Sequence, residues 1–107
     1  MRNFLLALVV LAVSPMAAIA QDAAPNQVTV VIKNFDFEPM DVTIPAGGSV
    51  TWTNRDGEPH TVTSVDALFR SGALDQDQSF TFTFAKPGIY AYLCTIHPKM
   101  RATVTVR

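Results

Sequence analysis

The sequence has few of the residues that mark several common classes of protein. One cysteine among 107 residues excludes an intramolecular disulfide. Beyond residue 20 no apolar stretch is long enough to cross a bilayer. The charges are dispersed and sum to a formal net charge of −1, without the basic stripe of a nucleic-acid-binding protein. We therefore expect neither a membrane span in the mature chain nor a nucleic-acid partner.

Residues 1–20 have the pattern of a secretory signal peptide. Arg2 supplies a positive charge, residues 4–13 form a short apolar run, and Ala18-Ile19-Ala20 matches a small-residue cleavage site. We expect cleavage after Ala20 and export to the periplasm. An odd cysteine in an exported protein is typically reactive, paired with another molecule or bound to a metal.

The rest of the chain is typical of strands and turns. A short polar lead, residues 21–27, precedes one expected domain at residues 28–107. From Ser79 to Phe84, hydroxyl and aromatic side chains alternate, which is the period of a half-buried strand. Seven or eight such segments, separated by glycine, proline and asparagine turns, predict an all-β Greek-key sandwich. Residues 60–64 are expected to form a strand, and residues 65–78 a loop or one short helical turn.

Aromatic side chains are expected to supply most of the core of this small domain. The predicted core aromatics are Trp52, Phe80, Phe82, Phe84, Tyr90 and Tyr92.

Three residues with metal-binding side chains follow one another at intervals of three near the C-terminus. Cys94, His97 and Met100 offer a thiolate, an imidazole and a thioether, and His60 lies far upstream. Each has an ordinary explanation when taken alone: a buried thiol, a surface histidine, a core methionine and a histidine that caps a turn. Together they match two histidines and one cysteine in a trigonal plane with a weak axial methionine, which is a blue-copper site. Pro98 stiffens the loop.

The residues around these positions resemble the cupredoxins, or type 1 blue copper proteins. The run from Gly88 to Met100 is similar to the family's C-terminal copper loop, and residues 50–54 with Pro59-His60-Thr61-Val62 are similar to the region of its first histidine. The short spacing resembles that of the amicyanin loop, whereas plastocyanin has a longer one before the methionine. The resemblance implies one copper ion, with His60, Cys94 and His97 as equatorial ligands and Met100 as the axial ligand.

Three further residues are expected to surround the ligands. Family members often carry asparagine directly after the first histidine, where it tethers the cysteine loop, and Thr61 stands there instead. A hydroxyl can also form a hydrogen bond, so the ligand set stands, and the tether at Thr61 is left open. Met40 is expected to pack near the site, and Pro98 to border it.

The resemblance implies a small soluble electron carrier that is not an enzyme. We expect a monomer whose redox partners, a dehydrogenase, cytochrome or oxidase, dock transiently near His97. The expected docking surface comprises Met40, Pro59, Ile96 and Pro98, with Lys99 and Arg101 at its rim. The main alternative is copper delivery or sequestration by the same residues. An enzyme with Cys94 as nucleophile and His97 as base, and a structural zinc site, are weaker alternatives.

Overall fold

The computed structural model describes residues 9–13 and 24–107, so the expected cleavage site after Ala20 lies outside the described residues. The described part contains eight strands and no helix. The strands are β1 (Gln27–Lys33), β2 (Asp36–Glu38), β3 (Asp41–Ile44), β4 (Ser49–Asn54), β5 (Thr63–Ser64), β6 (Ser79–Thr83), β7 (Gly88–Leu93) and β8 (Arg101–Val106). Within the same residues, no helix is long and apolar enough to cross a membrane.

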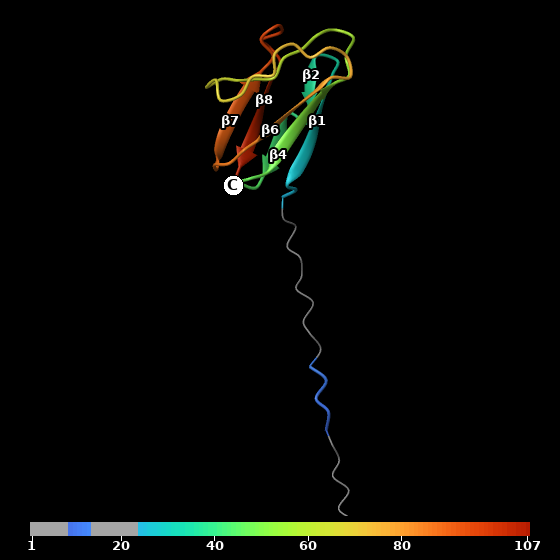
Figure 1. Ribbon diagram of the computed structural model, residues 1–107, viewed down its shortest axis with the longest axis vertical. Helices are drawn as coiled ribbons and strands as arrows, with labels where there is room; N and C mark the ends of the chain where they lie inside the picture. The colour runs from blue at the N-terminus through green and yellow to red at the C-terminus, as the bar shows by residue number, and fades with distance from the viewer. Residues whose placement is uncertain (1–8, 14–23) are drawn as a thin grey trace, which may run out of the picture.

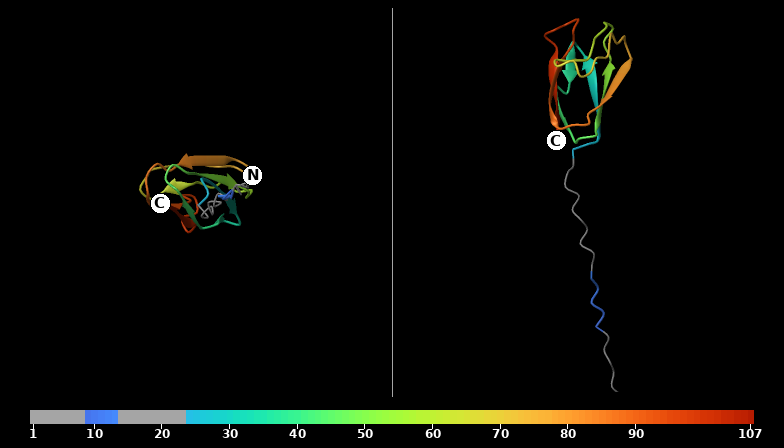
Figure 2. Two further views of the ribbon diagram at one scale, coloured as in Figure 1. Left: turned by 90° about the horizontal axis from the view of Figure 1, so that it is seen from below. Right: turned by 60° about the vertical axis from the view of Figure 1, so that its left-hand side comes forward.

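The strands form two four-stranded sheets that face each other (Figures 1 and 2), which confirms the predicted β-sandwich. One sheet has the order β2-β1-β4-β6 and the other β3-β8-β7-β5. Both sheets are mixed, because β1 pairs parallel with β4, and β3 pairs parallel with β8. The loops that follow β4 and β7 lie at the end of the sandwich opposite the entry of the chain into β1 (Figure 1).

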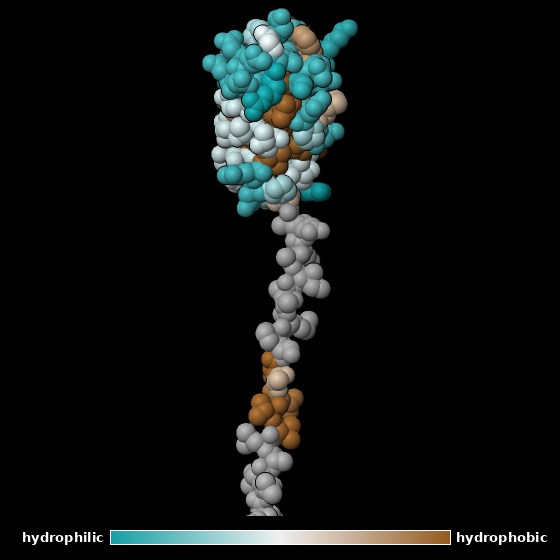
Figure 3. Space-filling view, turned by 90° about the vertical axis from the view of Figure 1, so that its right-hand side faces the viewer, coloured by the Kyte–Doolittle hydropathy of each residue, from teal (hydrophilic) through white to brown (hydrophobic). Residues whose placement is uncertain are grey.

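The core lies between the two sheets and is rich in aromatic side chains. Trp52, Tyr92 and Phe84 are almost completely buried, as predicted. Phe80 and Phe82 are only partly buried because they lie on β6, which is an edge strand, and Tyr90 on β7 is also partly buried. The core also contains Phe37 and Phe69, at 1% and 4% exposure, which the expected set did not include. Figure 3 shows polar residues over most of one side of the domain, around a smaller group of apolar ones.

Residues 60–78 depart most from the sequence-based expectation. The expected strand at 60–64 is reduced to the two residues of β5, and His60 instead forms an isolated bridge with Leu74. Residues 65–78 contain no helical turn. They form an irregular segment that folds back along the His60 loop, with Ser64 and Val62 bonded to Phe69 and Ser71. This segment satisfies backbone groups near His60 that a longer strand would have bonded to a neighbouring strand.

Candidate metal centre

Two distant segments bring three ligand atoms together at one end of the sandwich. Cys94 directly follows β7, His97 lies three residues further on, and His60 ends the loop that leaves β4. The Sγ atom of Cys94 is 3.8 Å from Nδ1 of His60 and 3.8 Å from Nδ1 of His97. One ligand atom from each residue lies within 4.8 Å of the other two. His60 and Cys94 are fully buried and His97 is partly exposed.

The loop from Cys94 to Met100 is closed by its own backbone. The N–H of Cys94 donates to the carbonyl of Met100 at 3.1 Å, and the N–H of Met100 donates to the carbonyl of His97 at 2.9 Å. Pro98 is exposed at the tip, where its carbonyl accepts a bond of 3.0 Å from Nε of Arg101. Met100 returns to the interior with 4% of its surface exposed. The loop therefore places a buried thioether directly after the surface histidine.

Thr61 connects the loop that carries His60 with the loop that carries Cys94. Its backbone N–H donates to Sγ of Cys94 at 3.3 Å, and its hydroxyl oxygen accepts from the N–H of Thr95 at 2.8 Å. The hydroxyl oxygens of Thr61 and Thr95 are 2.9 Å apart, which is within hydrogen-bonding distance. A threonine hydroxyl thus makes the connection for which the related proteins often use asparagine.

Asp56 fixes the orientation and the tautomer of the His60 ring. Its Oδ2 accepts a hydrogen bond of 2.8 Å from Nε2 of His60. Burial alone would raise the pKa of Asp56, but hydrogen bonds from the backbone N–H groups of Phe35 and Asn34 and from His60 hold that pKa below its ordinary value. An ionised carboxylate only accepts, so the proton lies on Nε2 and the lone pair of Nδ1 faces Cys94. Sequence reasoning missed Asp56, although an acidic residue four positions before a candidate ligand is a usable signal.

Phe35 covers both histidines from the turn between β1 and β2. Its ring centroid is 5.2 Å from that of His60 and 4.9 Å from that of His97, and both pairs meet edge to face. Phe35 is 46% exposed and lies in the turn. Met40, which was expected to pack near the site, is 56% exposed. Pairing of β3 with β8 instead places Met40 beside the start of β8, at the surface of the same end.

The donor set fits a soft or borderline transition metal better than a hard cation. Two imidazole nitrogens and a thiolate suit copper or zinc, whereas magnesium and calcium prefer oxygen donors. Donors that each lie about 2.0–2.3 Å from a shared ion are separated by about 3–4 Å, and the observed sulfur–nitrogen separations of 3.8 Å fall in that range. Zinc favours a fourth strong ligand, but the remaining sulfur in the loop is the weak thioether of Met100. The site therefore fits copper.

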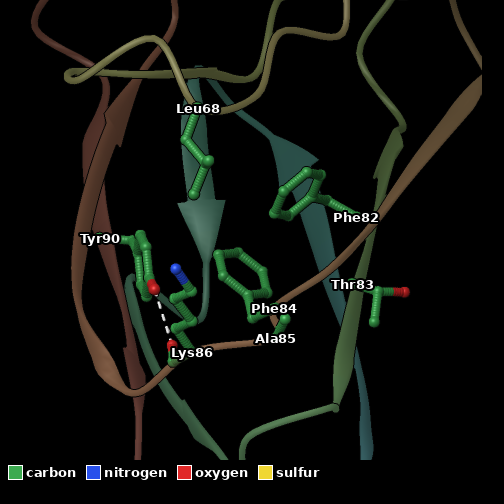
Figure 4. Close-up of a pocket in the computed structure, with 7 residues that line it drawn as sticks. All are labelled: Leu68, Phe82, Thr83, Phe84, Ala85, Lys86 and Tyr90. Carbon is green, nitrogen blue, oxygen red and sulfur yellow. Dashed lines mark hydrogen bonds between the residues drawn. The ribbon is translucent and has the colours of Figure 1, made fainter.

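An apolar pocket elsewhere in the domain is unrelated to these residues. It has a volume of about 230 Å³ and is lined mainly by Leu68, Phe82, Phe84 and Tyr90 (Figure 4). The only interaction drawn across it is the bond from the Tyr90 hydroxyl to the Lys86 carbonyl, at 2.7 Å. No candidate metal ligand lines this pocket.

Comparisons with known proteins agree with the geometry. A family model for the cupredoxin-like domain matches residues 4–106. Amicyanin of Paracoccus denitrificans is 34% identical over 98 residues, which cover 87% of this chain and 73% of that protein. Amicyanin-alpha of Methylorubrum extorquens is 34% identical over 118 residues, and the match covers 99% of this chain and 99% of that protein. The Cu(I) structure of an amicyanin mutant superimposes with a TM-score of 0.72 at 31% identity, covering 80% of this chain and 87% of the other. The chain belongs to the cupredoxin-like family.

Proposed function

We propose that the protein is a blue-copper electron carrier. His60, Cys94 and His97 would bind one copper ion as equatorial ligands, and Met100 would approach as the weak axial ligand. The observation that supports this most strongly is the convergence of two Nδ1 atoms on one buried sulfur, at 3.8 Å each. The amicyanin and plastocyanin relatives are electron carriers and not enzymes.

The protein's own contribution to electron transfer is a rigid donor set. Bound copper would supply the one-electron chemistry, cycling between +1 and +2. The hydrogen bonds within the Cys94 loop and the contacts of Thr61 hold the donors in nearly fixed positions. Soft sulfur donors favour Cu(I) and imidazole nitrogens are acceptable to Cu(II), so little movement is needed when the charge changes. Small reorganisation favours fast transfer.

We propose His97 as the exit route for electrons, because its ring is the ligand nearest the surface. Exposed apolar side chains occur at the same end of the sandwich: Phe35 and Ile96 at 46% and Met40 at 56%. Lys99 and Arg101 are also exposed and would add positive charge at the rim. Such a surface suits a small, short-lived encounter with a redox protein. The sequence pattern of residues 1–20 supports a periplasmic location, and we propose that the carrier acts there as a monomer.

Two other functions for the same residues are less well supported. The pair of contacts from Cys94 to His60 and from His60 to Asp56 resembles a nucleophile, base and orienting acid. Cys94 is completely buried, however, and offers no surface to a substrate. Copper delivery remains the main alternative, and it would require rapid release of copper to an acceptor.

Addition of Cu(II) to the purified protein tests the proposal. We expect an intense blue colour from thiolate-to-copper charge transfer, reversible redox cycling and slow loss of copper to a chelator. Cys94→Ala should abolish the colour, whereas Met100→Leu should keep part of it and raise the reduction potential. A pale product would rule out the type 1 site, and fast transfer of copper to the chelator would favour delivery.

A further inference from the structure

The turn between β1 and β2 has an unusual sequence for its backbone conformation. Lys33 pairs with Asp36, so Asn34 and Phe35 form a two-residue hairpin turn. Both residues have positive φ angles, 54° and 59°. This conformation is favourable for asparagine and glycine but strained for a bulky side chain, and hairpins of this kind usually have glycine at the second position. A strained residue persists where its surroundings hold it in place.

The carboxylate of Asp56 holds this turn. Oδ1 accepts from the N–H of Asn34 at 2.8 Å and Oδ2 from the N–H of Phe35 at 3.0 Å. The same Oδ2 accepts from Nε2 of His60 at 2.8 Å. The Asp56 side chain is only 12% exposed, and its bond to His60 is partly shielded from water. The carboxylate of Asp56 therefore joins the candidate ligand His60 to a strained turn whose two residues lie 21 and 22 positions from Asp56 in the chain.

The strained turn places its ring directly against the candidate metal centre. Phe35 makes edge-to-face contacts with both His60 and His97. The ring centroids of the two histidines are 5.0 Å apart. Edge-to-face packing restricts the tilt of each ring. Glycine at this position would relieve the turn and lose both contacts.

We propose that Asp56 is a positioning residue of the metal centre, which fixes the His60 ring directly and the His97 ring through Phe35, and which lowers the reduction potential of the bound metal. This inference rests on the proposed function and names a determinant of the same site. A carboxylate that accepts the second ring N–H of a ligating histidine makes the imidazole a stronger donor. A stronger donor favours Cu(II) over Cu(I).

Asp56→Asn and Glu58→Gln are the matched variants for the test. Each removes one negative charge from the same loop, but Glu58 is exposed and no hydrogen bond of its side chain occurs in the described residues. In the copper-loaded protein, Asp56→Asn should raise the Cu(I) to Cu(II) ratio at a fixed applied potential by about tenfold. That change corresponds to about 59 mV for one electron. Glu58→Gln should change the ratio by no more than about twofold, since water and salt screen an exposed charge.

Phe35→Gly separates the role of the ring from the stability of the turn. It creates an Asn-Gly pair, which suits this turn, so the free energy of unfolding should stay the same or rise. The copper hyperfine lines of the Cu(II) form should nevertheless broaden, as both histidine rings gain freedom. If Asp56→Asn fails to fold, this variant still tests the part of the proposal that concerns the ring of Phe35.

The outcomes distinguish the two proposals. Absence of a blue band in the unaltered protein would overturn the proposed function, and this inference with it. A blue protein in which Asp56→Asn and Glu58→Gln shift the potential equally would overturn the positioning role of Asp56 alone. Unchanged hyperfine lines in Phe35→Gly would overturn the part assigned to the ring.

Discussion

Tyr92 has the most perturbed protonation equilibrium of the core. Burial, with a smaller contribution from the charge of Asp41, raises the pKa of its phenol from 10.0 to about 12, although the nearby indole N–H of Trp52 opposes the rise without completing a hydrogen bond. Among the described residues, neither the Tyr92 hydroxyl nor the Trp52 indole nitrogen completes a hydrogen bond. A buried hydroxyl without a partner costs stability. The phenol is therefore tolerated for the packing of its ring.

Tyr92→Phe should reduce the fall in the free energy of unfolding that occurs at alkaline pH. In the unfolded chain the phenol ionises near pH 10, whereas in the folded chain it ionises near pH 12. The neutral form thus supports folding fully below pH 10, and this support is lost as the pH rises from 10 to 12. The loss amounts to about 3 kcal/mol. Urea unfolding from pH 7 to pH 12 would measure it.

At pH 7 the same substitution should be neutral or stabilising, because it removes an unpaired hydroxyl and keeps the ring. Tyr90→Phe is the control, since the Tyr90 hydroxyl is bonded to the Lys86 carbonyl in a less buried position. If Tyr92→Phe and the unaltered protein lost stability alike between pH 10 and pH 12, this account of Tyr92 would be wrong.

Single residues differ in how far the sequence indicates their place in the site. The spacing of Cys94, His97 and Met100 within one loop is visible directly. Thr61 is adjacent to His60, so its contact with the cysteine loop could be expected from the resemblance. Phe35 and Asp56 depend on the packing of a turn against a distant loop. No local pattern encodes that contact, and the strained conformation of Phe35 runs against its ordinary preference.

At the scale of the elements, the loop that carries His60 depends on Asn54 at the end of β4. The Asn54 side chain is fully buried; its amide donates to the carbonyls of Glu58 and Leu74, both at 2.8 Å, and its oxygen accepts from the N–H of Asp56 at 2.9 Å. These bonds join β4, the His60 loop and the irregular segment at 65–78. The hydrogen bonds of this one amide side chain therefore take the place of bonds that a longer strand would have made with its neighbour.

Asn54→Ala should destabilise the protein by about 2–4 kcal/mol, because it removes the three hydrogen bonds that this fully buried side chain makes. Urea unfolding would give the free energy, and hydrogen exchange should quicken at the amides of His60 and Leu74, which bond to each other's carbonyls. Thr51→Ala is the control on the same strand, because its hydroxyl bond to Thr81 is exposed. An equal cost for both substitutions would contradict the role of Asn54.

The sequence predicts strands where hydrophobic alternation is strong and fails where pairing is irregular. The alternation at 79–84 gave β6 and the inward direction of its phenylalanines. By contrast, the parallel partnership of β1 with β4 joins segments separated in the chain, and alternation carries no information about partners. Residues 60–64 have β-branched side chains, but most of their bonds go to the 65–78 segment and only two residues pair with β7.

At the scale of the whole molecule, the site brings together segments that follow strands of different sheets. His60 follows β4 in one sheet, and Cys94 follows β7 in the other. A metal bound to both would link the two sheets at one end of the sandwich. Since the unfolded chain does not hold the donors together, the free energy of binding adds to the free energy of folding.

Copper should therefore raise the melting temperature, and more so at neutral than at acid pH. At a free copper concentration of 100 times the dissociation constant, the gain is about 2.7 kcal/mol. For a domain of this size that corresponds to a rise of about 10–20 °C. Protons compete with copper for the imidazole and thiolate donors, so the rise should shrink between pH 7 and pH 5. Calorimetry with and without Cu(II) at both pH values would measure it.

Cys94→Ser supplies the comparison, because it keeps both histidines and removes the thiolate that both Nδ1 atoms face. Its melting temperature should rise far less with copper. Any rise that is left would come from copper bound to scattered donors on the surface. An equal rise in both proteins would place the copper on those surface groups. The rise in melting temperature would then not show that copper links the ends of β4 and β7. A rise that requires Cys94, by contrast, can come only from copper bound where the ends of both sheets meet.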